Sequence, residues 1–367
     1  MDLRYPPEAE AFRAELRGWL DANLPDGLTE QSPLEERREW NRVLADAGYA
    51  AISWPEEFGG RGASVMDQLV FNEEMDRARA AGPVNIIGMP NIAPAIMQWG
   101  TEQQKARFLP RMRRGDDIWC QGMSEPNAGS DLASLQCHAV RDGDSFVVNG
   151  QKTWNTLGDI ASWCQLYVRT DRDAPKHKGI SCLLVDMSLP GIEVRPLVTI
   201  TGEHGFSELF FSDVRVPADA LLGPLNEGWK VATTTLSHER AGVAKLHLSL
   251  RREVRDLIDA ARTHGRADDP VLRQRLARAY LEAEYLKLLA DRAISGQLHG
   301  RPTGPESSLV KLVWSDVSNH VAEAWTEVTG TVDNRRLSVR QVSIAGGTTQ
   351  VNKNIVAQRV LGMPRGL

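Results

Sequence analysis

Two short segments of the chain combine an aromatic side chain with hydrogen-bonding groups. Met123-Ser124 follows an apolar run and offers a backbone amide and a hydroxyl. Trp154-Asn155-Thr156 places an indole and a hydroxyl two residues apart, hence on one side of a strand. A flavin ring needs donors and acceptors around its pyrimidine edge and an apolar or aromatic wall along its face. Taken alone, however, these residues are better explained as a tryptophan of the core and a serine that caps a turn than as a flavin site.

Other chemistry-bearing patterns are weaker. No Gly-x-Gly-x-x-Gly follows a strand-like run, so a nicotinamide site has no support. The stretch 149–153 resembles the end of a phosphate loop but lacks the upstream glycine, and we interpret it as part of a β-hairpin over residues 145–154 that turns at Asn149-Gly150. Ser308 and Lys311 fit a Ser-x-x-Lys pattern without its companion motifs, which favours an ordinary helix surface. The histidines lack metal-ligand spacing, so we expect no metal.

The hydrophobic pattern that must position these residues changes twice along the chain. Up to about Gly115, apolar residues recur with helical spacing. Between about Trp119 and Pro224, short β-branched or aromatic runs alternate with turn residues. Long helical stripes return from Gly228, and we expect helices over residues 229–257, 271–295 and 307–328.

The resulting fold class is α+β. We expect an N-terminal helical domain (1–117), a central antiparallel β domain (118–225) and a C-terminal four-helix bundle (226–367).

Composition excludes several broad classes. The chain has 367 residues, of which 42% are hydrophobic and 25% charged, as in a globular protein of two to three domains. Its net charge of −5 gives no basic excess for nucleic acid. The four cysteines form no Cys-x-x-Cys pair, and neither a signal-peptide core nor a run of some 20 apolar residues is present. We therefore predict a cytoplasmic protein without a membrane span.

Five segments, in order and spacing, resemble the acyl-CoA dehydrogenase family. The first is Trp119-Cys120-Gln121-Gly122-Met123-Ser124-Glu125-Pro126-Asn127-Ala128-Gly129-Ser130-Asp131, which is similar to the family's flavin signature. The other four lie at residues 149–156, 211–223, 228–240 and 346–365. The resemblance covers essentially the whole chain, and its helical, β, helical order agrees with the family fold.

The resemblance implies an FAD enzyme that oxidises an acyl-CoA thioester to a trans-2-enoyl-CoA. It also implies which residues contact the cofactor. Ser130 is expected near both the cofactor and the CoA part of the substrate. The implied cofactor contacts are Met123, Ser124, Ser130, Trp154, Thr156, Thr348 and Gln350.

The general base is the point at which this chain departs from many family members. These members carry a Glu where this chain has Gly346, and glycine cannot accept a proton. Isovaleryl-type and long-chain-type members carry the base on a C-terminal helix just before an Arg, which makes Glu239, before Arg240, the candidate base. The alternative is that Glu239 forms a buried ion pair with Arg240 or a neighbouring helix. The Gly346 N–H still suits the thioester oxygen, so the implied substrate residues are Ser130, Arg240 and Gly346.

The residues that family members donate across a subunit interface look altered. Arg262 lies one position away from the family's arginine, and the glutamine that follows it in the family is absent. Glu327 replaces the first glutamine of the family's Gln-x-x-Gly-Gly segment, where its negative charge would repel the FAD pyrophosphate. The resemblance implies an electron-transferring flavoprotein as acceptor and a homodimer or homotetramer. Two alternatives stay open: a sister chain in a mixed heterotetramer that completes the FAD site, and an acyl group on a carrier protein instead of CoA.

Overall fold

The computed structural model describes residues 5–241, 246–299 and 306–364, with the side chains of 238–241 and 306 also outside the description. The chain folds into two compact units. The helical unit comprises residues 1–23, 64–79 and 240–367, and the sheet unit comprises 24–63 and 80–239. The N-terminal helices are therefore shared between the two units.

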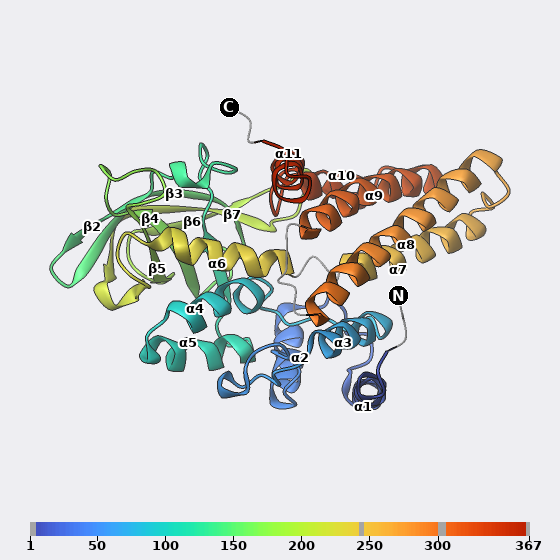
Figure 1. Ribbon diagram of the computed structural model, residues 1–367, viewed down its shortest axis with the longest axis horizontal. Helices are drawn as coiled ribbons and strands as arrows, with labels where there is room; N and C mark the ends of the chain where they lie inside the picture. The colour runs from blue at the N-terminus through green and yellow to red at the C-terminus, as the bar shows by residue number, and fades with distance from the viewer. Residues whose placement is uncertain (1–4, 242–245, 300–305, 365–367) are drawn as a thin grey trace. The chain divides into compact units, whose positions relative to one another are not determined.

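The sheet unit is built on an eight-stranded sheet within the described residues (Figure 1). Its strand order is β6-β7-β3-β2-β4-β5-β8, with β1 paired to β4. Neighbours pair antiparallel as expected, except that β1 and β2 each pair with β4 in parallel. The strands are β1 (Trp119–Gly122), β2 (His138–Asp142), β3 (Ser145–Thr156), β4 (Trp163–Arg169), β5 (Ile180–Asp186), β6 (Ile192–Leu197), β7 (Phe206–Pro217) and β8 (Leu221–Leu222).

The predicted hairpin turn at Asn149-Gly150 is wrong. β3 runs through this pair without a break, and Gly150 lies at a register shift with φ of 143°. The Asn149 side chain bonds Asp213 on β7 at 3.0 Å, so it serves a sheet contact. The turn falls at Gly143 instead, which has φ of 58° and joins β2 to β3. Asp142 pairs with Ser145, so Gly143-Asp144 forms a two-residue turn with glycine in the left-handed position.

Helices complete the sheet unit: α2 (Leu34–Asp46), α4 (Ala93–Trp99), α5 (Glu102–Arg114) and α6 (Gly228–Ala241). Thr101 caps α5 through a capping box with Gln104, and Gly115 ends it in the left-handed conformation. α6 contacts β4 through Thr235, whose hydroxyl lies 3.2 Å from the Tyr167 hydroxyl. This contact is buried, so α6 is fixed to the sheet along its first turns.

The helical unit contains α1 (Pro7–Asn23), α3 (Val65–Arg77), α7 (Leu246–Thr263), α8 (Pro270–Leu298), α9 (Glu306–Thr329), α10 (Asn334–Ser338) and α11 (Thr349–Ile355). One apolar core is shared by α7, α8 and α9. The helix expected over 229–257 is recorded as α6 and α7, and the residues between them lie outside the description. A helical C-terminal domain is confirmed, although α6 groups with the sheet unit.

Glu74 joins α3 to α1 within the helical unit. Its carboxylate is buried and accepts hydrogen bonds from Arg13, Arg17 and Arg77, the closest at 2.7 Å. These arginines satisfy a charge that burial alone would disfavour. None of the helices in the described ranges is long and apolar enough to cross a bilayer.

Candidate active site

The sheet unit brings the two sequence-predicted cofactor segments together. The Thr153 N–H donates to the Ser124 carbonyl at 2.9 Å, and the Asn155 amide donates to the Gln121 carbonyl at 2.5 Å. The segment after β1 is therefore bonded directly to the end of β3. Met123 and Ser124 lie in one local site with Trp154 and Thr156.

Trp154 has an unusual backbone. Its φ is 61°, in the left-handed region that β-strand residues avoid, and the β3–β7 register shifts between Lys152 and Asn155. The bulge turns the indole outward, so that 62% of the residue is exposed. Its ring meets Phe206 edge to face, with centroids 5.8 Å apart. The aromatic wall predicted from the sequence is thus presented at the surface of the sheet unit rather than buried in its core.

Three predicted hydroxyl groups in this unit are free to bind a ligand. The side chains of Ser124, Ser130 and Thr156 make no hydrogen bond within the described part of the chain. Ser124 and Thr156 are half-buried, and Ser130 is exposed in the loop that follows β1. A free hydroxyl beside a partly covered aromatic ring is a suitable edge contact for a planar polar ligand.

A buried ion pair lies directly behind Met123 and Ser124. Lys152, which is 0% exposed, donates to a Glu125 carboxylate oxygen at 2.8 Å and to the Met123 carbonyl at 3.1 Å. The same carboxylate accepts the backbone N–H groups of Gln136 and Cys137 at 2.6 and 2.8 Å. Sequence analysis missed this pair. Lys152 falls at even spacing from buried Phe146 and Val148, and a lysine at an inward position needs a partner.

The predicted residues Gly346, Thr348 and Gln350 lie in the helical unit. Gly346 and Gly347 have φ of 64° and 89°, conformations that favour glycine. The Thr348 hydroxyl accepts the Val351 N–H at 3.2 Å, which makes it the N-cap of α11, and Gln350 is exposed in the first turn. The loop before Gly346 is held by Ser315, which donates to the Val342 carbonyl at 2.8 Å.

Glu239 and Arg240 lie in the last turn of α6, and their side chains are outside the described residues. The division between the two units falls between them. Their catalytic and substrate-binding roles stay predictions.

The two residues that look altered in sequence have partners within the helical unit. Arg262 bonds Asp259 at 2.6 Å on the exposed side of α7. Glu327 pairs with Arg275, so its negative charge is partly offset. The repulsion expected from an isolated Glu327 is correspondingly smaller.

Three family models match consecutive parts of the chain. They describe the acyl-CoA dehydrogenase N-terminal domain (residues 6–116), middle domain (120–214) and C-terminal domain (226–361). Acyl-CoA dehydrogenase IpdE1 of Mycobacterium tuberculosis is 40% identical over 382 residues, which cover 98% of this chain and 98% of IpdE1.

Solved structures agree over the full length. The structure described as "Tcur3481-Tcur3483 steroid ACAD" has a TM-score of 0.88 and 34% identity, and the match covers 100% of both chains. The ChsE4-ChsE5 complex from Mycobacterium tuberculosis has a TM-score of 0.82 and 33% identity over 100% of both chains. From its domain models, its relatives and its fold alike, the chain belongs to the acyl-CoA dehydrogenase family and is an oxidoreductase of lipid metabolism.

Proposed function

We propose that the chain catalyses FAD-dependent α,β-dehydrogenation of an acyl-CoA thioester to the trans-2-enoyl-CoA. The observation that carries the proposal is Trp154, an outward-facing tryptophan at a left-handed bulge. A bulky residue in that conformation is strained by roughly 1–3 kcal/mol, and such strain concentrates at ligand sites. The indole supports the proposal because a planar cofactor would cover apolar surface that is otherwise left in water.

The described residues around Trp154 fit an isoalloxazine. Ser124 and Thr156 supply free hydroxyls for its polar edge, and Met123 lies beside them. Thr348 and Gln350, at the start of α11, are also cofactor contacts in this proposal, as the family resemblance implies. When bound, FAD supplies the acceptor for the hydride equivalent that leaves the β-carbon of the substrate.

In this proposal Glu239 is the general base that removes the α-proton. A carboxylate is a suitable group for this proton transfer. The Gly346 N–H polarises the thioester oxygen, an interaction worth roughly 3–4 kcal/mol per donor in other enzymes. Ser130 and Arg240 contribute to the substrate site.

We further propose a bulky, branched or ring-bearing acyl group. Ala345 and Gly346 are small and exposed, so they leave space at the loop where many family members carry larger side chains. The relative with 34% identity is described as a steroid enzyme, which supports the same substrate class. The electron acceptor in the proposal is an electron-transferring flavoprotein, and the setting is the cytoplasm, where the four free, buried cysteines stay reduced.

Anaerobic titration of the purified protein tests this proposal. Straight-chain, branched and steroid-type acyl-CoA thioesters, and an acyl-carrier-protein thioester, are added while flavin absorbance is followed. We expect yellow protein that is bleached fastest by a bulky acyl-CoA. Protein that holds FAD but is bleached by no thioester would contradict the dehydrogenase proposal, and preference for the carrier-bound thioester would correct its substrate.

A mixed oligomer with a sister chain is the second candidate, and one surface of α8 favours it. Leu281, Tyr285 and Leu288 follow helical spacing on the face opposite the apolar core and are 60%, 67% and 48% exposed. Such a stripe on a single helix is typical of a contact between chains. Two of the solved relatives carry two chain names in their descriptions, which supports an unlike partner.

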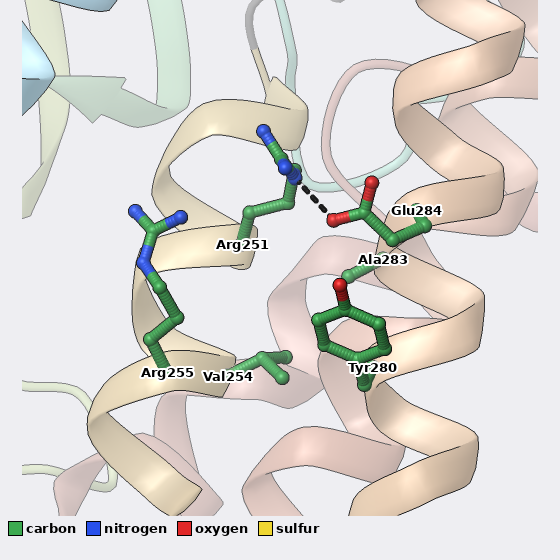
Figure 2. A pocket seen from close by; sticks show the side chains of 6 residues that line it. All are labelled: Arg251, Val254, Arg255, Tyr280, Ala283 and Glu284. Atoms are coloured by element: carbon green, nitrogen blue, oxygen red, sulfur yellow. Dashed lines mark hydrogen bonds and ion pairs between the residues drawn. The ribbon is translucent and has the colours of Figure 1, made fainter. Parts of the chain in front are cut away.

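The cleft beside this stripe provides polar groups for the same contact (Figure 2). Arg251 of α7 bonds Glu284 of α8 at 2.7 Å, whereas Arg255 has no ion-pair partner among the described residues. Tyr280 lies on α8 below Glu284 in this view, across from the two arginines of α7. Aromatic and arginine side chains are enriched where interfaces carry most of their binding energy.

Light scattering of the chain alone and of the chain co-expressed with a sister subunit tests the second candidate. Leu281→Glu and Tyr285→Glu are expected to release a lower-mass species. Val271→Glu, equally exposed on α8 but ten residues before Leu281, about 15 Å along the helix, is the matched control and should leave the mass unchanged. If both stripe variants keep the parental mass, α8 is not the interface. FAD bound only in the co-expressed complex would favour the mixed oligomer over the homo-oligomer.

A further inference from the structure

A buried charge pair lies at the point where three segments of the sheet unit converge. Glu125 accepts hydrogen bonds from the backbone of residues 136–137 and from Lys152 of β3. Lys152 in turn donates to the carbonyl of Met123. The two side chains are at most 7% exposed. This arrangement ties the segment after β1 to β2 and β3 without using any surface contact.

The contact with Met123 determines how the next peptide group is oriented. In a trans peptide the carbonyl of one residue and the N–H of the next point in opposite directions. Lys152 holds the Met123 carbonyl toward the interior, so the Ser124 N–H points away from Lys152. That N–H is bonded to no acceptor within the described residues, and it belongs to the same residue as the free Ser124 hydroxyl.

A charge pair in such a place is a poor stabiliser compared with apolar packing. The free-energy cost of desolvating the lysine and the glutamate nearly cancels the attraction between them. We therefore infer that the pair serves to specify one geometry. The directional bonds of Lys152 and Glu125 do specify one: they allow a single orientation of the 123–124 peptide.

We propose that Lys152 and Glu125 are positioning residues that aim the Ser124 N–H and hydroxyl at the polar edge of the flavin. The inference rests on the proposed function, because it needs FAD beside Ser124. Neither side chain has to touch the cofactor. Lys152 acts through the Met123 carbonyl, and Glu125 acts through Lys152 and the 136–137 backbone.

The pair also sets the local charge in a way that a packing role would not. Glu125→Gln leaves the Lys152 cation behind the flavin edge, which favours the reduced, more negative flavin and should raise its reduction potential. Lys152→Met leaves the Glu125 anion and should lower the potential. The double variant Glu125→Gln/Lys152→Met removes both charges. We expect it to stay folded, because replacing a buried ion pair by neutral residues costs little stability.

Three measurements on the full-length protein test the proposal. Hydrogen exchange follows the amides of Gln136, Cys137 and Thr153, FAD titration gives affinity, and dye-coupled reduction gives the flavin potential. In the double variant we expect faster exchange at these amides and FAD binding weakened by about 2- to 13-fold, the loss of one oriented hydrogen bond. In the single variants we expect potential shifts of opposite sign.

The matched control is Asp142→Asn/Arg215→Gln. This pair joins β2 to β7 at 2.8 Å on the exposed surface of the same sheet and should change none of the three measurements. FAD binding in the double variant equal to that of the parent protein would overturn the positioning role while leaving the proposed function intact. Potential shifts of one sign in both single variants would do the same. Parent protein that binds no FAD, alone or with a sister chain, would overturn the proposed function and this inference together.

Discussion

Replacing Trp154 separates the contribution of its side chain from that of its backbone. In an ordinary strand, glycine is less stable than alanine by roughly 0.5–1 kcal/mol because of its larger entropy when unfolded. At φ of 61° the glycine variant should be the more stable of the two, because a residue with a Cβ is destabilised by about 1–2 kcal/mol in the left-handed region and glycine is not.

The expected magnitude follows from these two opposing effects. Trp154→Gly should be more stable than Trp154→Ala by about 0.5–1 kcal/mol in the free energy of unfolding. Both variants lose the edge-to-face contact with Phe206, so that loss cancels in the comparison. Both should also weaken FAD binding by about 2- to 13-fold through the lost aromatic contact, the equivalent of 0.5–1.5 kcal/mol.

Urea denaturation of the apoprotein and FAD titration give the two quantities independently. A matched pair at Tyr167, in the middle of β4 with ordinary strand pairing, provides the control: there the alanine variant should be the more stable. If alanine is also the better residue at position 154, the bulge does not impose a left-handed backbone. If FAD binds both variants as it binds the parent, Trp154 is not the flavin wall.

Three further predictions concern other parts of the chain. Burial would raise the pKa of Glu74, but hydrogen bonds from three arginines outweigh it and lower the pKa to about 2. The stabilisation that follows, at most about 3 kcal/mol, is present above about pH 4.5 and lost as pH falls toward 2. In acid denaturation, the difference in stability between the parent and Glu74→Gln should therefore be smaller at pH 2 than at pH 6. Gly347→Ala, at φ of 89°, should lower the free energy of unfolding by about 1–2 kcal/mol, whereas Gly205→Ala, with open space around it, should be neutral by the same denaturation assay. Burial raises the pKa of Cys137 to about 11, so a thiol reagent at pH 8 should label it only after unfolding, and rapid labelling of native protein would contradict this.

The sequence predicts the order of elements well and their grouping less well. Helical spacing of Leu16 and Leu20 identifies the apolar face of α1, and both residues are fully buried. The same spacing cannot tell which partner covers that face. α3 groups with α7 through the bond from Arg252 to Asp76, and α1 joins α3 through Glu74, contacts between residues some 60 to 180 positions apart.

Local signals also fail where a bulge replaces a turn. Asn149-Gly150 has the composition of a hairpin turn, yet Gly150 serves a register shift because a Cβ there would lie 2.6 Å from the Cys137 Cα. The second bulge, at Trp154, follows from pairing with β7, which no short window contains. For the candidate site, residue types around Ser124 and Trp154 were predictable, whereas the Glu125–Lys152 pair depends on a contact 27 positions apart.

Flavin bleaching in Glu239→Gln is the most direct test of the proposed chemistry. The variant is mixed anaerobically with the acyl-CoA that reduces the parent fastest, and Glu227→Gln, which changes an acid bonded to Lys230 just before α6, serves as control. Glu239→Gln is expected to retain FAD but to bleach about 10²- to 10⁴-fold more slowly, the usual contribution of a general base, while the control bleaches like the parent. Bleaching of Glu239→Gln within a few-fold of the parent rate would show that another group removes the α-proton.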